Sequence, residues 1–188
     1  MRKSLLFPTE VYEDEILNIN NDILKNECLQ LQKFSPNGVS VSNTGGWQSS
    51  SFEKPISSEI EKLIDQIVIR LEKIYKDYNI TRRPKLLNYW ININSPGNYN
   101  ISHNHTLSFF SCVYYVKVPE NSGDLIIERA DDSAYFIQYF EEINQHGAQA
   151  ILFDTAENKL VCFPSWVKHS VGQNLSNDTR ISIAFNLV

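Results

Sequence analysis

The chain is poor in the residues that mark several special classes of protein. Its 188 residues include three cysteines, one methionine, seven glycines and seven prolines. The cysteines, Cys28, Cys112 and Cys162, are far apart and form no Cys-x-x-Cys pair, so a disulfide framework is not indicated. Because Cys112 and Cys162 lie inside apolar runs, we expect them to be buried free thiols, which suits a reducing cytoplasm.

Long apolar runs and an excess of positive charge are also missing. No stretch approaches the roughly 18 apolar residues of a membrane span, and Pro8 interrupts the first apolar residues too early for a signal peptide. Lys and Arg number 17 against 22 Asp and Glu, a net charge of −5, which disfavours a broad nucleic-acid-binding surface but leaves a local groove open. We expect a soluble, cytoplasmic protein with no membrane partner.

The length suits a single domain over residues 1–188, with a helical part at 1–85 and a strand-rich part at 86–188. Residues 10–33 and 57–78 carry apolar residues at helical spacing, and Ser57 or Ser58 can cap the second helix. Short runs rich in Val, Ile, Phe and Tyr predict strands at 86–94, 101–105, 108–118, 123–129, 149–153, 159–163, 168–172 and 179–187. This order indicates an α+β fold with helices packed on one sheet of a sandwich or barrel.

Two segments look like loops. Residues 34–55 contain a Gly45-Gly46 pair and Trp47, which we expect to pack onto the domain rather than contact a ligand. Residues 130–147 are the least regular and form a loop or a short inserted helix, in which His146 is expected to have a structural role. Loops of these lengths often shape access to a binding site.

The histidines are few and their positions are informative. Of four in the chain, two form the pattern His103-Asn104-His105, and His169 follows in a later segment, eleven residues before Arg180. Residues i and i+2 of a strand point to the same face, so His103 and His105 can converge, and His169 can complete a three-ligand face for a metal such as Fe(II). The arginine indicates an anion in the same cavity.

These residues resemble the 2-oxoglutarate- and Fe(II)-dependent dioxygenases. That family has a double-stranded β-helix, or jelly roll, and an HxD motif followed by a distal histidine and an arginine that binds 2-oxoglutarate. His103 matches the first histidine, His169 the distal one and Arg180 the arginine, and Ser182 completes an Arg-x-Ser pattern. The resemblance implies that the N-terminal helices pack on one sheet of a jelly roll.

Two further likenesses are narrower. Residues 111–116 resemble the prolyl hydroxylase strand whose second tyrosine contacts 2-oxoglutarate, which implicates Tyr115. Residues 42–49, the His-Asn-His motif and residues 163–169 resemble a small branch found in phages and bacteria, over nearly the whole chain. A phage origin would place the protein in the host cytoplasm.

One departure from the family pattern concerns the third metal ligand. His105 stands where the family has the HxD aspartate, and three imidazoles leave a metal more positive than two imidazoles and a carboxylate. Alternatively, His105 lies outside the coordination sphere and a carboxylate binds, with Asp124 and Glu128 the nearest candidates in the sequence.

The resemblance implies a hydroxylase that uses Fe(II), 2-oxoglutarate and O2 on a protein side chain, a nucleotide or a small metabolite. Two alternatives stay open: a cupin-type three-histidine dioxygenase without 2-oxoglutarate, in which Arg180 holds a substrate carboxylate, and a non-catalytic jelly-roll binding module. Asn94, Asn186 and Trp47 are weaker candidates for the cavity wall, whereas Trp90, Phe163 and Trp166 are expected in the core or at the rim. Exposed strand edges permit a dimer, but no feature of the sequence specifies one.

Overall fold

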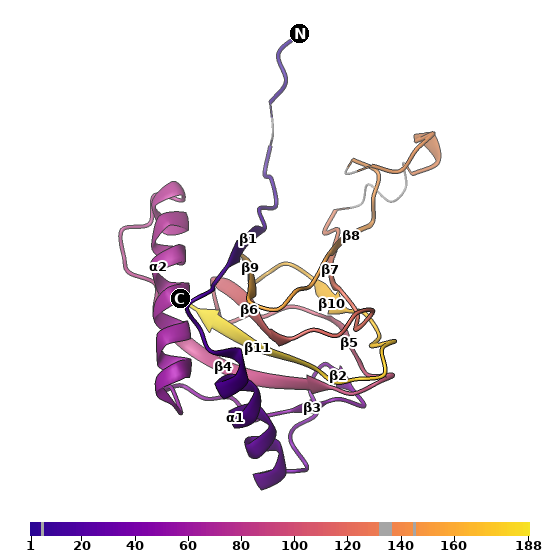
Figure 1. Cartoon of the computed structure of the whole chain (residues 1–188). Coiled ribbons are helices and arrows are strands. Elements are labelled where there is room, and N and C mark those ends of the chain that lie inside the picture. Colours follow the sequence, from indigo (N-terminus) through magenta and orange to yellow (C-terminus); the bar gives the residue numbers. More distant parts are fainter. Residues whose placement is uncertain (5, 132–136, 145) are drawn as a thin grey trace.

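The computed structural model describes residues 1–4, 6–131, 137–144 and 146–188, which form two helices and two antiparallel sheets (Figure 1). The helices are α1 (Asn21–Phe34) and α2 (Ser58–Asp77). The larger sheet contains, in spatial order, β1 (Tyr12–Glu15), β9 (Lys159–Pro164), β6 (Phe110–Lys117), β11 (Arg180–Leu187), β4 (Leu86–Asn94) and β3 (Trp47–Gln48). The smaller sheet contains β2 (Asn43–Thr44), β5 (Tyr99–His103), β10 (His169–Val171), β7 (Leu125–Glu128) and β8 (Ala150–Phe153). This is the predicted jelly roll.

The two helices pack on the outer face of the larger sheet (Figure 1). Helix α2 begins as predicted, because the Ser57 Oγ caps it by accepting a hydrogen bond from the backbone N–H of Ile60 at 3.2 Å. Its apolar stripe, which includes Leu63, Ile67 and Leu71, is buried. The apolar stripe of α2 covers one face of the larger sheet, and the opposite face of that sheet is turned toward the smaller sheet.

Strand β11 illustrates how one strand serves both faces. Ile181, Ile183 and Phe185 belong to the apolar core under the helices. Arg180 and Ser182, at alternate positions, line a cavity between the two sheets. Period-two alternation therefore separates the core residues from the cavity residues on the same strand.

The predicted helix at 10–33 is wrong in its first half. Residues 12–15 form β1, which pairs with β9 so that Glu15 lies opposite Lys159. Helix α1 starts only after Asn20, whose Oδ1 accepts hydrogen bonds from the backbone N–H groups of Asp22 and Ile23. Ile16 and Ile19 before this cap are buried without being helical, whereas Leu17 is exposed, because pairing with β9 overrides the local periodicity.

The predicted loop at 34–55 contains the short strands β2 and β3. Trp47 packs onto the domain as expected: it is buried, and its Nε1–H donates to the carbonyl oxygen of Ser35 at 2.8 Å. Of the predicted insertion at 130–147, residues 132–136 and 145 lie outside the described residues. Residues 137–144 extend away from both sheets (Figure 1).

The later predicted strands agree with the structure to within a few residues, but the strand predicted at 101–105 ends at His103. All three cysteines are buried and free. None of the described helices is both long enough and apolar enough to cross a membrane.

Candidate active site

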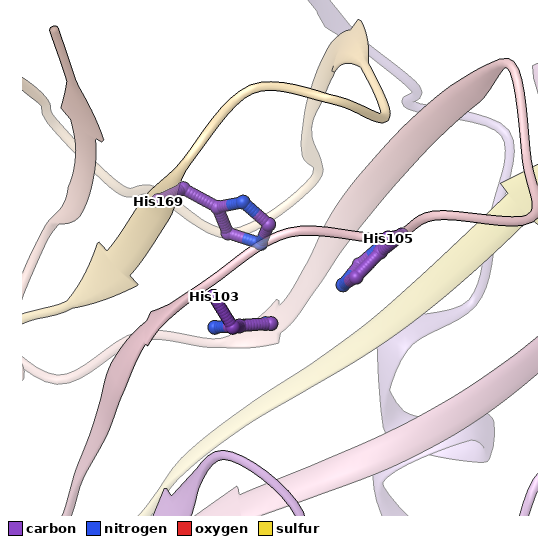
Figure 2. Close-up of side chains that lie close together, drawn as sticks. All are labelled: His103, His105 and His169. Atoms are coloured by element: carbon purple, nitrogen blue, oxygen red, sulfur yellow. The ribbon is translucent and has the colours of Figure 1, made fainter. Parts of the chain in front are cut away.

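Three imidazoles meet at one point between the sheets (Figure 2). His103 is the last residue of β5 and His169 the first of β10, and the two occupy paired register positions. The ring centroid of His105 lies 5.2 Å from that of His103 and 5.0 Å from that of His169. One nitrogen of each ring lies within 4.8 Å of the others, an arrangement that a single metal ion can bridge.

The reason for this convergence differs from the predicted one. Strand β5 ends at His103, so His105 is not its i+2 partner on a strand face. The chain turns after β5, and the backbone N–H of His105 donates to the carbonyl oxygen of Ser165 at 2.9 Å. Trp90 packs edge-on against the His105 ring at 5.2 Å. A loop anchored to the end of β9, rather than strand alternation, brings the third imidazole to the site.

Hydrogen bonds fix which ring nitrogen faces the site. His103 Nδ1 lies 2.8 Å from the carbonyl oxygen of Ile101, and His169 Nδ1 lies 3.0 Å from that of Val167. Because a carbonyl oxygen can only accept, each Nδ1 carries the hydrogen and each Nε2 keeps its lone pair. The same arrangement, with side-chain partners, occurs at His105. Metal-binding histidines usually have such an outer partner.

All three imidazoles are neutral at pH 7. Burial lowers the pKa of His105 to about 4, and repulsion by His103 adds to this effect. Burial also lowers the pKa of His169 to about 3, with a further contribution from His103, and it lowers the pKa of His103. A neutral imidazole is the form that binds a metal, so the site does not have to lose protons first.

The carboxylates that could replace His105 as a ligand are not in this group. Within the described part of the chain, the group that could hold a metal here contains the three histidines and neither Asp124 nor Glu128. The Glu128 carboxylate instead accepts a hydrogen bond from the Ser102 Oγ at 2.7 Å, on an exposed side of the sheet.

Arg180 is a buried cation in the same cavity, only 2% exposed. Its Nη1 donates to the carbonyl oxygens of Ser122 and Gly123, at 2.9 and 2.8 Å. Its Nε is buried and has no partner in the described residues. Burial lowers the pKa of the guanidinium group. An unpaired buried N–H costs free energy, and a carboxylate in the cavity would satisfy it.

Ser182 and Tyr115 lie beside Arg180. They occupy paired register positions on β11 and β6, and both line the cavity. Burial raises the pKa of Tyr115, so its hydroxyl group stays protonated and can donate a hydrogen bond. The three predicted anion-binding residues therefore share one wall of the cavity.

The cavity also contains residues that were not predicted from the sequence. Asn92 and Asn100 line it, and Trp90 and Phe163, expected in the core or at the rim, line it too. The remaining lining residues are Ser42, Ser111, Cys112, Val113, Leu125, Val171 and Ala184. Period-two alternation along β4 would have found Asn92, because Trp90 and Asn92 share a strand face.

Three weaker candidates for the cavity wall are not among its lining residues. Asn94 is buried and donates from Nδ2 to the Asn100 Oδ1 at 3.3 Å. Trp47 packs against the helical side, in the core cluster. Asn186 contacts the back of His105 through its Oδ1. Trp166, expected in the core or at the rim, is 53% exposed.

Comparison with known proteins identifies the family. The family model described as "Putative 2OG-Fe(II) oxygenase" matches residues 88–186, just over half of the chain. That range includes all three histidines and Arg180. A comparison with curated proteins gave no match.

Solved structures share the fold at low sequence identity. A prolyl-4-hydroxylase from Pseudomonas putida superposes with a TM-score of 0.67 at 14% identity, over 94% of this chain and 91% of that one. A prolyl hydroxylase from Trichoplax adhaerens, solved with a hypoxia inducible factor peptide, gives 0.64 at 14% identity, over 94% and 82%. A non-heme, alpha-ketoglutarate-dependent carbocyclase from nogalamycin biosynthesis gives 0.65 at 12% identity, over 95% and 79%.

At such identities these structures establish the fold alone. The match to the family model goes further, and it agrees with the fold and with the three-histidine group. The chain belongs to the 2-oxoglutarate- and Fe(II)-dependent oxygenases, oxidoreductases that use Fe(II), 2-oxoglutarate and O2.

Proposed function

We propose that the chain is a hydroxylase in which His103, His105 and His169 bind Fe(II) through Nε2. Arg180, Ser182 and Tyr115 bind 2-oxoglutarate. The observation that carries this proposal is the convergence, in one cavity, of three neutral imidazoles and a buried guanidinium group with an unpaired N–H. In this family the bound iron and 2-oxoglutarate supply the oxidation of a substrate C–H bond by O2.

The residues fit both groups. Three imidazole ligands on one side of a metal leave coordination positions open for 2-oxoglutarate and O2. The Arg180 guanidinium can bind the far carboxylate of 2-oxoglutarate, while the hydroxyl groups of Ser182 and Tyr115 donate to the same carboxylate. Ser122 and Gly123 hold Arg180 from behind and so fix the direction of its unpaired edge.

The charges of the cavity-lining residues limit which kind of substrate group can enter the site. Among the described lining residues there is no aspartate, glutamate or lysine, and Arg180 is the one residue with a permanent charge. Once 2-oxoglutarate neutralises Arg180, the remaining wall is uncharged. The lining residues therefore offer no acidic partner to a cationic substrate group, whether it belongs to a protein side chain, a nucleotide or a small metabolite.

We further propose that residues 1–188 act as one domain, because the apolar core is continuous from both helices into the larger sheet. The three buried free cysteines fit a protein of the reducing cytoplasm.

An anaerobic titration tests the function. Fe(II) and then 2-oxoglutarate are added to the metal-free protein, and the visible metal-to-ligand charge-transfer band is recorded. The proposal expects the band in the wild type and its absence in His169→Ala. Metal binding without the band would favour the cupin-type dioxygenase, with Arg180 holding a substrate carboxylate. No metal binding would leave a jelly-roll binding module.

A further inference from the structure

His105 differs from the other two site histidines in what holds it from behind. The Nδ1 atoms of His103 and His169 face backbone carbonyl oxygens, which any residue could supply. The Nδ1 of His105 instead lies 2.8 Å from the Asn186 Oδ1 and 2.7 Å from the Ser111 Oγ. Position 105 is where the family pattern has an aspartate. The histidine that replaces it is therefore held by two side chains, those of Asn186 and Ser111.

The orientation of the Asn186 amide is set from its other end. Its Nδ2 donates to the Asn88 Oδ1 at 3.0 Å on the neighbouring strand β4. With Nδ2 used in this way, Oδ1 is the atom that faces His105. An amide oxygen can only accept, so the His105 Nδ1 carries the hydrogen and Nε2 faces the cavity.

A chain of buried hydroxyl groups completes the support. The Ser111 Oγ donates to the Asn186 Oδ1 at 2.9 Å and lies 2.8 Å from the Ser165 Oγ. The Ser108 Oγ donates to the Ser165 Oγ at 2.8 Å. Ser111 and Ser165 are 1% and 0% exposed, so water does not compete for the contacts that the Ser111 Oγ makes with Ser165 and Asn186. Networks of this kind, shielded from water, hold a side chain in one orientation.

We propose that Asn186, oriented by Asn88 and Ser111, is a positioning residue that holds His105 in the Nδ1–H tautomer with Nε2 ready to bind metal. The site is then built for three imidazoles and is not a two-histidine, one-carboxylate site that has lost its carboxylate. This inference rests on the proposed function for its metal, but the tautomer of His105 is a property of the metal-free protein.

The network also opposes a carboxylate at this position. The Asn186 Oδ1, which can only accept, would face an aspartate side chain at 105, and turning the Asn186 amide to offer Nδ2 would set its Oδ1 against the Asn88 Oδ1. The Ser111 hydroxyl group alone could turn to donate to such a carboxylate. The surroundings of residue 105 therefore match a ring N–H donor.

The test compares three variants in metal-free protein and in an anaerobic Fe(II) titration. Asn186→Leu removes the acceptor, Asn186→Asp keeps an acceptor, and Asn94→Leu is the matched control, a buried asparagine on β4 that is not among the lining residues of the cavity. Long-range nitrogen–hydrogen NMR correlations report the His105 tautomer.

We expect one Nδ1–H tautomer in the wild type, in Asn186→Asp and in Asn94→Leu. In Asn186→Leu we expect a mixture of tautomers and Fe(II) affinity about 10- to 100-fold weaker, the usual cost of losing an outer partner. A wild-type tautomer and wild-type affinity in Asn186→Leu would overturn the inference.

Two controls keep the outcomes separate. If Asn186→Leu does not fold, Ser111→Ala removes one of the two contacts to Nδ1, and it is expected to give a smaller shift in the same direction. If the wild type has the Nδ1–H tautomer but binds no Fe(II), the proposed function fails while the positioning role stands. If the wild type itself shows mixed tautomers, the positioning role fails whatever the metal does.

Discussion

His103 and His169 lie opposite each other in the register of β5 and β10, with their ring centroids 4.2 Å apart. Strand pairing alone therefore brings two of the three imidazoles together, without help from any loop. His169 is also buried, whereas His103 is at the more open side of the pair.

His169→Ala should abolish tight metal binding and leave the fold intact, because it removes one ligand and no core packing beyond the ring. The loss in Fe(II) affinity should exceed the roughly 10- to 100-fold that loss of an outer partner costs. Anaerobic titration measures the affinity and circular dichroism the fold. Retention of wild-type affinity would remove His169 from the proposed ligand set.

Arg180→Met should weaken 2-oxoglutarate binding about 10- to 100-fold, as expected for loss of a charge-assisted hydrogen-bonded pair worth about 1.5–3 kcal/mol. Fe(II) affinity without 2-oxoglutarate should change little, because Arg180 is not in the three-histidine group. Arg83→Met is a suitable control, since Arg83 pairs with Glu72 on the exposed side of α2. Equal 2-oxoglutarate affinity in both variants would contradict the proposed role.

The metal-free protein should lose stability as the pH falls below about 6.5. An unfolded histidine takes up a proton near that pH, whereas the folded pKa is about 4 for His105 and about 3 for His169. The unfolded chain therefore binds more protons between these values, and the free energy of unfolding decreases as the pH drops toward 4.

Urea unfolding at several pH values, on wild type and on His105→Gln, measures this effect. The variant should show a shallower loss of stability below pH 6.5, because one of the depressed pKa values is gone. Acidic groups contribute equally to both proteins and cancel in the difference. Identical pH profiles would mean that His105 is not held neutral by its surroundings.

Gly123→Ala should both destabilise the protein and weaken 2-oxoglutarate binding. Gly123 has φ +90°, and a Cβ there would lie 2.1 Å from the carbonyl oxygen of Gly172. Its own carbonyl oxygen accepts from Arg180, so a shift of this turn moves the guanidinium group. We expect a loss of about 1–3 kcal/mol or more in the free energy of unfolding.

Gly97→Ala separates backbone strain from the clash. Gly97 has φ +87°, but the nearest atom to a Cβ there is the Gln173 Nε2 at 4.0 Å. It should therefore lose less stability than Gly123→Ala and keep wild-type 2-oxoglutarate affinity. A calorimetric titration with 2-oxoglutarate measures the affinity of both variants. Equal losses of 2-oxoglutarate affinity in both would argue against the link from Gly123 to Arg180.

Much of the fold could be predicted from the sequence because the signals are local. Alternation along β4, β6 and β11 and the apolar stripe of α2 each follow from residues within one element. Strand β1 could not be found in this way, because its acidic sequence is a strand only through pairing with β9. The Asn20 cap was a readable signal for the true start of α1.

The site residues also divide into those that local sequence signals predicted and those that depend on contacts between distant segments. The three histidines and Arg180 were predicted from spacing and resemblance, but the position of His105 beyond the end of β5 depends on a contact with Ser165 far along the chain. Asn186 and Ser111 gave no signal of their support for His105, since they meet it only after β6 and β11 pair. The binding roles of Tyr115 and Ser182 stay predictions.

The alternation along β11 has a consequence for how such a protein can change over time. An insertion or deletion of one residue early in this strand would reverse the face to which the residues on one side of the change point. Arg180 and Ser182 would then point toward the apolar core under the helices, or the apolar residues that follow them would point into the cavity. One such change would therefore both remove residues from the cavity and destabilise the fold. Such a protein can therefore change its substrate through mutations in the segments that connect the strands. The length of β11 cannot change, because both the cavity and the apolar core depend on it.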